Sequence, residues 1–422
     1  MYAKSDGTKI SYSVNRGVPR GSVLGPLQLN ITYNGVLTSC EYTRALTIGF
    51  ADDTLLIVTC QYPWEVKEIA NEEICRITER IVDMGCEFAA QKTAAISVKP
   101  GRNLYDFKIQ VQDVPVVFSH SFKYLGVMVD NRCGFGDHIV YATAKTEKVI
   151  DKLRCVLRNT KAPREMVRRL YYAVTMQVLM YAAPIWAENL TKAQCEALNR
   201  VQRRMNIKVI QGYITVGSET ACVLSGNPPA DLIAREYVWI ADRIKNVPGD
   251  IDPNEALTTK RRIKAEERSR TSTEWQLRWS NKDNWTKHIC SEVEHLNRKV
   301  YRSTFHTTHL LYGKGVFGEY RMKLKKARNA HCFYCDGTDD AAHTLFECQM
   351  WDEEREKAAG KIENFSQHAD FLKEITKTRE TWQSFTTFAR EVMKTKEEKE
   401  RQVEKDQKDE EKRARQGRCS IS

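Results

Sequence analysis

The sequence predicts an α+β fold, in which a small antiparallel sheet with helices comes first and a mostly helical chain follows. Three observations support this prediction. Between positions 47 and 129, short apolar runs alternate with one amphipathic helical stretch. From position 137 on, apolar residues recur at helical spacing, and a short Cys/His cluster near position 332 indicates a small metal-bound segment. Strands grouped ahead of helices are typical of α+β proteins.

The first element is a β-hairpin over Thr47–Val58, in which two apolar runs flank a short acidic tip. Adjacent carboxylates point to opposite faces of a regular strand, but at a tight turn both can project into one cleft. Asp52 and Asp53 would then offer oxygen ligands to Mg²⁺, which proteins usually hold with one or two carboxylates and the substrate's phosphates. The alternative is a solvated turn, where Asp is common.

A glycine-bearing loop precedes the hairpin and leads into an apolar stretch from Pro26 to Leu37, which predicts a buried helix. Glycines let a backbone approach a nucleotide or a template strand closely, and a helix N-terminus favours phosphate. An ordinary turn ahead of a helix is the alternative. The candidate nucleotide- or template-binding residues are Gly17, Pro19, Arg20, Gly21 and Ser22.

Behind the hairpin, apolar residues at three- and four-residue steps predict an amphipathic helix from Val66 to Met84. With the hairpin, the strands that follow would form an antiparallel sheet packed against this helix. These predicted strands are Ala94–Val98, Phe107–Val111, Val114–Phe118 and Tyr124–Val129.

The next part is predicted to be helical. On the helix after Asp137, Lys145, Lys148 and Lys152 share one face, which suits a grip on phosphates, although a solvated face is equally open. One more helix is expected over Ala230–Lys245.

A breaker at positions 247–250 is the strongest candidate for a domain boundary. Beyond it, Trp275, Trp279 and Trp285 interleave with basic residues, so both base stacking and core packing are open.

The second candidate metal site is a Cys/His cluster with the spacing C-x2-C-x7-H-x4-C, formed by Cys332, Cys335, His343 and Cys348. Thiolates and imidazole at this spacing suit tetrahedral Zn²⁺, and so short a segment has too little core to fold without metal. His331 is a competing ligand. Phe333 and Tyr334 flank the site, where they could stack on bases or fill its core.

Composition indicates the class of partner. A net charge of +11 over 422 residues favours a polyanion such as RNA or DNA, because Lys and Arg neutralise phosphates. The first residues lack the basic-then-apolar pattern of a signal peptide, which favours a reducing compartment. In such a compartment most of the thirteen cysteines would be buried or free thiols rather than disulfides. No apolar run approaches the length of a membrane span, so we expect an intracellular protein of nucleus and cytoplasm. The charged stretch Lys394–Arg415 predicts an exposed single helix.

Four segments in series resemble one family, the reverse transcriptases of non-LTR (LINE-type) retrotransposons. Each segment is weak evidence alone, and their order carries the resemblance. The segments that resemble motifs B, C, D and E are, in that order, Gly17–Leu27, Phe50–Asp53, Lys92–Thr93 and Phe122–Val127. Later segments extend the resemblance to about Trp351, namely Tyr181–Trp186, Trp275–Trp279, Gly313–Phe317 and the Cys/His cluster.

The resemblance implies an RNA-directed DNA polymerase that copies an RNA template into DNA with Mg²⁺ or Mn²⁺ ions. It implies that Asp52 and Asp53 are catalytic metal ligands, and that Lys92 could protonate the leaving pyrophosphate. A solvated surface lysine is the alternative for Lys92. The Cys/His cluster resembles the CCHC zinc knuckle that follows the polymerase domain in these elements. The sequence departs from the family pattern at two positions near the first loop. Arg20 stands where the family usually has Gln, and Gln28 stands where it usually has an apolar residue.

The resemblance predicts five parts. They are a partial reverse-transcriptase palm with motifs B to E (1–135), a helical thumb with following helices (136–246), a basic helical connector (247–330), the CCHC zinc knuckle (331–355) and a charged helical tail (356–422).

In the family, the first metal-binding aspartate lies on a strand upstream of motif B. Sixteen residues precede Gly17, and Asp6 is the one aspartate among them. We therefore expect a truncated copy without fingers and without the first catalytic aspartate, inactive by itself. Two functions remain open, a polymerase fragment and a non-catalytic nucleic-acid-binding protein that uses the thumb and the knuckle. The sequence does not indicate the oligomeric state.

Overall fold

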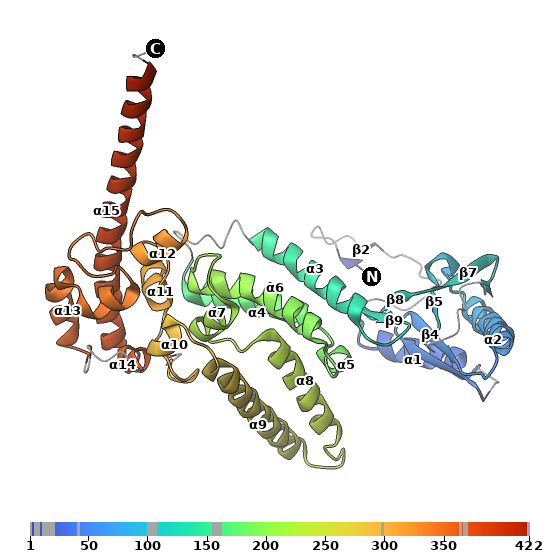
Figure 1. The fold of residues 1–422 in the computed structure, drawn as a ribbon. Helices are drawn as coiled ribbons and strands as arrows, with labels where there is room; N and C mark the ends of the chain where they lie inside the picture. Colours follow the sequence, from blue (N-terminus) through green and yellow to red (C-terminus); the bar gives the residue numbers. More distant parts are fainter. Residues whose placement is uncertain are drawn as a thin grey trace. The chain divides into compact units, whose positions relative to one another are not determined.

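The computed structural model describes residues 2–3, 9–10, 22–39, 43–98, 108–153, 163–296, 299–362, 365 and 370–419 (Figure 1). Helices dominate, and the strands of these residues form four small sheets, which confirms the α+β class. The chain divides into two compact units, Met1–Asp137 and His138–Ser422. The finer division into five parts stays a prediction.

The acidic hairpin forms as predicted in the first unit. Strands β3 (Ala45–Phe50) and β4 (Asp53–Val58) pair antiparallel with Phe50 opposite Asp53, so two residues make the turn. Ala51 takes a φ of 53°, in the left-handed region that a residue with a Cβ rarely adopts. A tight turn therefore holds the acidic tip.

Two helices pack against this hairpin. Helix α2 (Pro63–Asp83) confirms the predicted amphipathic helix, and its buried face includes Ile77 and Ile81. Helix α1 (Gly25–Leu37) was predicted to be buried, and this was wrong, since Leu27 and Ile31 are both more than half exposed. The main contacts of α1 among the described residues are with β3 and α2, and Leu27 and Ile31 remain exposed outside these contacts.

The acidic hairpin and the later strands were predicted to share one antiparallel sheet, and this was wrong, since β3 and β4 form a two-stranded sheet of their own among the described residues. The later strands themselves differ from the prediction in two further ways. The first is direction, because the short strand β5 runs parallel to β7, whereas β6 pairs antiparallel with β7. The second is that the predicted strand Tyr124–Val129 is a hairpin, because Leu125 and Gly126 take positive φ angles and reverse the chain. The strands are β1 (Tyr2–Ala3), β2 (Lys9–Ile10), β5 (Ala95–Ile96), β6 (Lys108–Val111), β7 (Val114–Ser119), β8 (Ser121–Tyr124) and β9 (Val127–Asp130).

The second unit is helical. On α3 (Gly136–Leu153) one face is buried, and the predicted stripe of Lys145, Lys148 and Lys152 is exposed. Helix α8 has the predicted bounds, Ala230–Lys245. The other helices before the Cys/His cluster are α4 (Glu165–Leu179), α5 (Ala183–Trp186), α6 (Lys192–Ile210), α7 (Ser218–Ser225), α9 (Pro253–Ser280), α10 (Trp285–Ile289), α11 (Phe305–Tyr312) and α12 (Gly318–Lys323).

A large core joins these helices to the C-terminal ones. Trp275 and Trp279 of α9 are buried in it, so these two rings pack rather than stack on bases. The helices after the cluster are α13 (Asp352–Ala359), α14 (Phe371–Ile375) and α15 (Arg379–Cys419). Within the described residues, no helix combines the length and the hydropathy that crossing a membrane requires.

Helix α15 confirms the predicted C-terminal helix, but the predicted exposure is wrong for part of it. The side chain of Lys396 is buried, although it lies in the stretch predicted to be exposed. Glu397 pairs with Arg401, four residues further along the helix, at 3.5 Å. Charge pattern alone therefore failed to predict which part of this helix packs against the core.

Candidate zinc centre and acidic hairpin

The four residues of the Cys/His cluster lie on two short segments. The first segment reverses direction where His331 pairs with Thr338 through the backbone, and it contributes Cys332 and Cys335. The second is a turn of π-helix over His343–Glu347, after which Cys348 follows directly. Asp340 starts that turn by accepting a hydrogen bond of 2.7 Å from the backbone N–H of His343.

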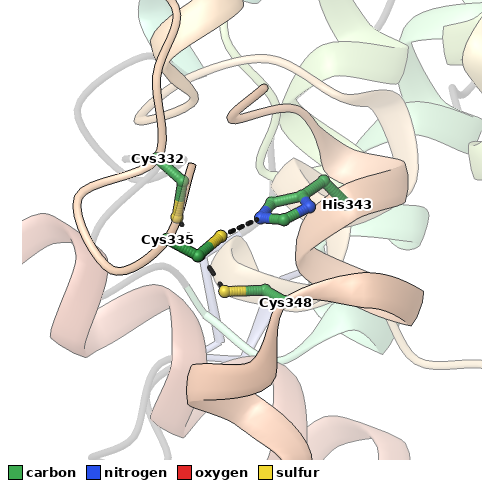
Figure 2. A group of neighbouring side chains, drawn as sticks. All are labelled: Cys332, Cys335, His343 and Cys348. Atoms are coloured by element: carbon green, nitrogen blue, oxygen red, sulfur yellow. Dashed lines mark hydrogen bonds between the residues drawn. The ribbon is translucent and has the colours of Figure 1, made fainter. Parts of the chain in front are cut away.

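The donor atoms of the cluster converge (Figure 2). The one ligand atom offered by each residue lies within 4.8 Å of all the others. The sulfurs of Cys332 and Cys348 are 3.8 Å apart. Tetrahedral Zn²⁺ with Zn–S bonds of about 2.3 Å places two sulfurs about 3.8 Å apart, whereas a disulfide needs about 2.05 Å. The spacing of the donors therefore fits a zinc ion and excludes a disulfide between these two cysteines.

The orientation of the histidine also suits a metal. The Nε2 atom of His343 faces the sulfur of Cys335 at 3.1 Å, and Nδ1 lies 3.5 Å from the carboxylate of Glu347. Ligating histidines commonly bind with one ring nitrogen and donate the other N–H to a carboxylate. The competing ligand His331 is not part of the cluster.

Burial affects the chemistry of the thiols. Cys348 is fully buried, and burial raises the pKa of its thiol well above its ordinary value. Zinc binds the thiolate, so loading this site would release a proton from Cys348. Zinc would supply structural cross-linking here, because all four coordination positions are filled by protein side chains.

The two aromatic residues beside the cluster have different environments. Tyr334 packs edge-on against Trp351, with ring centroids 5.3 Å apart, and belongs to the margin of the large core. Phe333 is 41% exposed. A basic stretch precedes it in the chain, with exposed side chains at Lys323, Lys325, Lys326 and Arg328. Phe333, rather than Tyr334, is therefore available for stacking on a base.

The acidic hairpin places two carboxylates at an exposed tip, because Asp52 and Asp53 both face solvent at the β3–β4 turn. Two carboxylates fit one Mg²⁺ that is also held by the phosphates of a substrate. Among the residues that the structure describes, the Cys/His cluster is the one group of three or more potential metal ligands. No third carboxylate of the described part of the chain therefore joins Asp52 and Asp53.

The other candidate residues are less informative. Lys92 ends a short 3₁₀ turn, Ala90–Lys92, and its side chain is exposed. The hydroxyl of Ser22 accepts a hydrogen bond of 2.9 Å from the backbone N–H of Gly25, at the start of α1. The remaining loop residues lie outside the described residues, and they are Gly17, Pro19, Arg20 and Gly21.

The sequence reasoning missed the residues that support the cluster. Glu347 lies four residues after His343, a spacing that places two side chains side by side on a helical turn and that could have been noticed. The pairing of Asp339 with Lys396 of α15 had no such signal, because 57 residues separate them.

Comparison with known proteins supports the family resemblance of the sequence. A Pol polyprotein of the type-1 retrotransposable element R1 2 of Nasonia vitripennis is 26% identical over 351 residues, which are 80% of this chain and 86% of that protein. A second Nasonia vitripennis Pol polyprotein, of element R1, is 25% identical over 62% of this chain and 81% of its own length. The homologues of this chain are Pol proteins of non-LTR retrotransposons.

Longer relatives are matched over a smaller share of their length. The RNA-directed DNA polymerase of the mobile element jockey from Drosophila funebris is 25% identical over 43% of this chain, and the match covers 20% of that polymerase. No protein-family model and no solved structure matches the chain.

Proposed function

We propose that this chain acts in RNA-directed DNA synthesis by a non-LTR retrotransposon, and that its zinc-binding segment holds single-stranded RNA or DNA. The names of the relatives support the first part, because several are RNA-directed DNA polymerases. The convergence of Cys332, Cys335, His343 and Cys348 beside an exposed aromatic ring is the observation that carries the second part.

Two features make this segment suited to single strands. Exposed aromatic rings bind unpaired bases by stacking, which tolerates any sequence, and Phe333 offers such a ring. Exposed cations attract the phosphates, and the basic stretch Lys323–Arg328 leads directly into the cluster. Binding should therefore be weak, tolerant of sequence and sensitive to salt.

The test measures zinc and nucleic acid on the full chain. We expect one zinc ion per chain and loss of that ion in Cys335→Ser. Affinity for a single-stranded RNA oligonucleotide should fall steeply as salt rises. Folded protein without stoichiometric zinc would refute the metal site. An affinity for RNA that does not change with salt would refute binding of the phosphates by the basic side chains.

A matched pair of variants tests the stacking ring. Phe333→Ala should weaken RNA binding by about 1 to 3 kcal/mol while zinc content stays the same. Leu277→Ala removes an apolar side chain that is 64% exposed on α9, and it should leave RNA binding unchanged. Equal effects of the two substitutions would assign the loss to general surface change rather than to stacking.

A second candidate function is the polymerase chemistry itself, and the exposed Asp52–Asp53 tip favours it. The pair would hold Mg²⁺ with the phosphates of an incoming nucleotide, and the ion would stabilise charge on the transferred phosphoryl group. Lys92, if it lies near the leaving group, would supply the proton for pyrophosphate. The proposal for nucleic-acid binding does not depend on this activity.

A further inference from the structure

Helix α15 contacts the chain around the Cys/His cluster through a buried cation, the ammonium group of Lys396. The side chain of Lys396 is 2% exposed and that of its partner Asp339 is 1% exposed. The ammonium group donates hydrogen bonds to Oδ1 of Asp339 and, at 3.3 Å, to the hydroxyl of Thr344. Both acceptors lie between Cys335 and Cys348, on the segments that carry the cysteines and the histidine.

Asp339 has no freedom to find another partner. Its second carboxylate oxygen accepts a hydrogen bond of 2.8 Å from the backbone N–H of Gly318. Its own backbone is also engaged, since it donates to the carbonyl of Ala330 at 2.7 Å and accepts from Glu319 at 3.0 Å. Lys396 is therefore the cation that neutralises a fixed, buried carboxylate, and removal of one partner would leave the other charge uncompensated.

A second ion-pair group continues this contact along α15. The guanidinium group of Arg321, which is almost fully buried, lies 2.7 Å from the carboxylate of Glu400 and 3.0 Å from that of Glu404. From Lys396 to Glu404, charged contacts thus connect α15 to Asp339 and Thr344, which lie between ligands of the cluster in the chain, and to Arg321 of α12.

The preceding turns of α15 are held differently. They insert apolar side chains into the large core, most of whose members come from helices outside the Cys/His cluster, although Cys332 and Cys348 belong to it too. The buried residues of these turns are Trp382, Phe385, Phe388, Val392 and Met393. Helix α15 therefore has a proximal half held by apolar packing, followed by a part from Lys396 to Glu404 held by charged contacts to Asp339 and to Arg321 of α12.

We infer that Lys396 is a positioning residue of the zinc centre, and that zinc binding in turn fixes the part of α15 from Lys396 to Glu404. This inference rests on the proposed zinc site. Lys396 contacts Asp339 and Thr344 in the same arrangement of the chain that brings the four ligand atoms together. Coupling of two binding events is reciprocal, so a contact that favours zinc must itself be favoured by zinc.

The first test measures zinc affinity of the full chain by competition with a chelator. Lys396→Met should bind one zinc ion at saturation, with an affinity lowered by about tenfold or more. The double variant Asp339→Leu/Lys396→Met removes both charges and should recover part of the loss. Lys394→Met is the matched control, because Lys394 is 69% exposed and should leave the affinity unchanged.

The second test follows hydrogen exchange along α15 in the unmodified chain, so it does not depend on whether a variant folds. Chelation of zinc should increase exchange at positions 396–406 and leave positions 382–393 protected. Unchanged protection of 396–406 in a chain shown to gain and lose one zinc ion would overturn this inference alone, as would an unaltered affinity in Lys396→Met. Failure of the unmodified chain to bind zinc would overturn the proposed zinc site together with it.

Discussion

Close packing around the histidine ligand of the cluster depends on a single glycine. A Cβ atom on Gly337 would lie 2.6 Å from Cε1 of His343, a distance that real Cβ contacts essentially never show, and 3.0 Å from its Nδ1. Any larger residue at this position must therefore displace the imidazole that faces Cys335. Ligand orientation is one of the features that set zinc affinity.

We expect Gly337→Ala to lower zinc affinity by about tenfold or more, measured by competition with a chelator. Gly249→Ala is the control, because a Cβ at position 249 would meet nothing within 4 Å. A zinc affinity that is unchanged in Gly337→Ala would mean that the ring of His343 does not contribute to the site.

A buried histidine gives a second prediction at this scale. His309 is fully buried between the rings of Tyr213 and Phe305, and neither of its ring nitrogens has a hydrogen-bond partner among the described residues. Burial, together with nearby His306, lowers the pKa of His309 to about 3 from an ordinary value of 6.5. The folded chain therefore keeps this imidazole neutral where the unfolded chain protonates it.

As the pH is lowered from 6.5 toward 3, this group should therefore reduce the free energy of unfolding by about 1.4 kcal/mol per pH unit. Above pH 6.5 the contribution is complete. Urea unfolding of His309→Leu should show a smaller loss between pH 6.5 and 4.5 than the unmodified chain. His288→Leu, at a side chain that is 62% exposed, should keep the original pH dependence, and identical slopes in all three proteins would contradict the prediction.

At the scale of elements, the contact between α1 and the acidic hairpin rests on another glycine. A Cβ on Gly49 of β3 would lie 2.6 Å from a ring carbon of Tyr33 and 2.9 Å from a methyl group of Leu37. The hydroxyl of Tyr33 is also hydrogen-bonded to Thr54 on the neighbouring strand. The helix therefore lies directly on the hairpin, and it fixes the strands that present Asp52 and Asp53.

Gly49→Ala should destabilise the N-terminal unit by about 1 to 3 kcal/mol, the usual cost of overpacking a tight contact. Gly35→Ala on α1 is the opposite case, since a Cβ there meets nothing within 4 Å, and it should stabilise the helix by up to about 1 kcal/mol. Thermal unfolding measures both changes. If Gly49→Ala stabilises the N-terminal unit as Gly35→Ala is expected to, the close contact at Gly49 does not exclude a side chain there.

At the scale of the whole molecule, the question is whether two carboxylates suffice for polymerase chemistry. In-line phosphoryl transfer by two metal ions requires one ion at the attacking oxygen and one at the leaving oxygen. Asp52 and Asp53 provide ligands for one ion, and no third carboxylate of the described residues joins them. The chain should therefore bind Mg²⁺ and nucleotide only loosely.

We expect no template-directed primer extension on RNA with Mg²⁺ by this chain alone, and none by Asp52→Ala. A reverse transcriptase of known activity serves as the positive control. Extension by the unmodified chain that is lost in Asp52→Ala would contradict the prediction. It would mean that another carboxylate completes the site, and Asp6, outside the described residues, would be the first to replace.

The sequence by itself determined the features that depend on residues close together in the chain. The apolar runs around Asp52 and Asp53 predicted the hairpin, and helical spacing predicted α8 with its observed bounds. The C-x2-C-x7-H-x4-C spacing predicted which four side chains would converge. These predictions held because periodicity, turns and ligand spacing are local properties, fixed within a few residues.

Only the tertiary structure decided which of these residues are buried and what they contact. Phe333 and Tyr334 are neighbours in the sequence, yet the ring of Tyr334 packs against Trp351 whereas Phe333 is 41% exposed. Lys396 lies in a stretch that is almost all charged, yet its side chain is buried and paired with Asp339. The two residues are 57 positions apart in the sequence, so only the fold brings them together. Burial and charge pairing depend on contacts between distant residues, and local sequence patterns contain no record of those contacts.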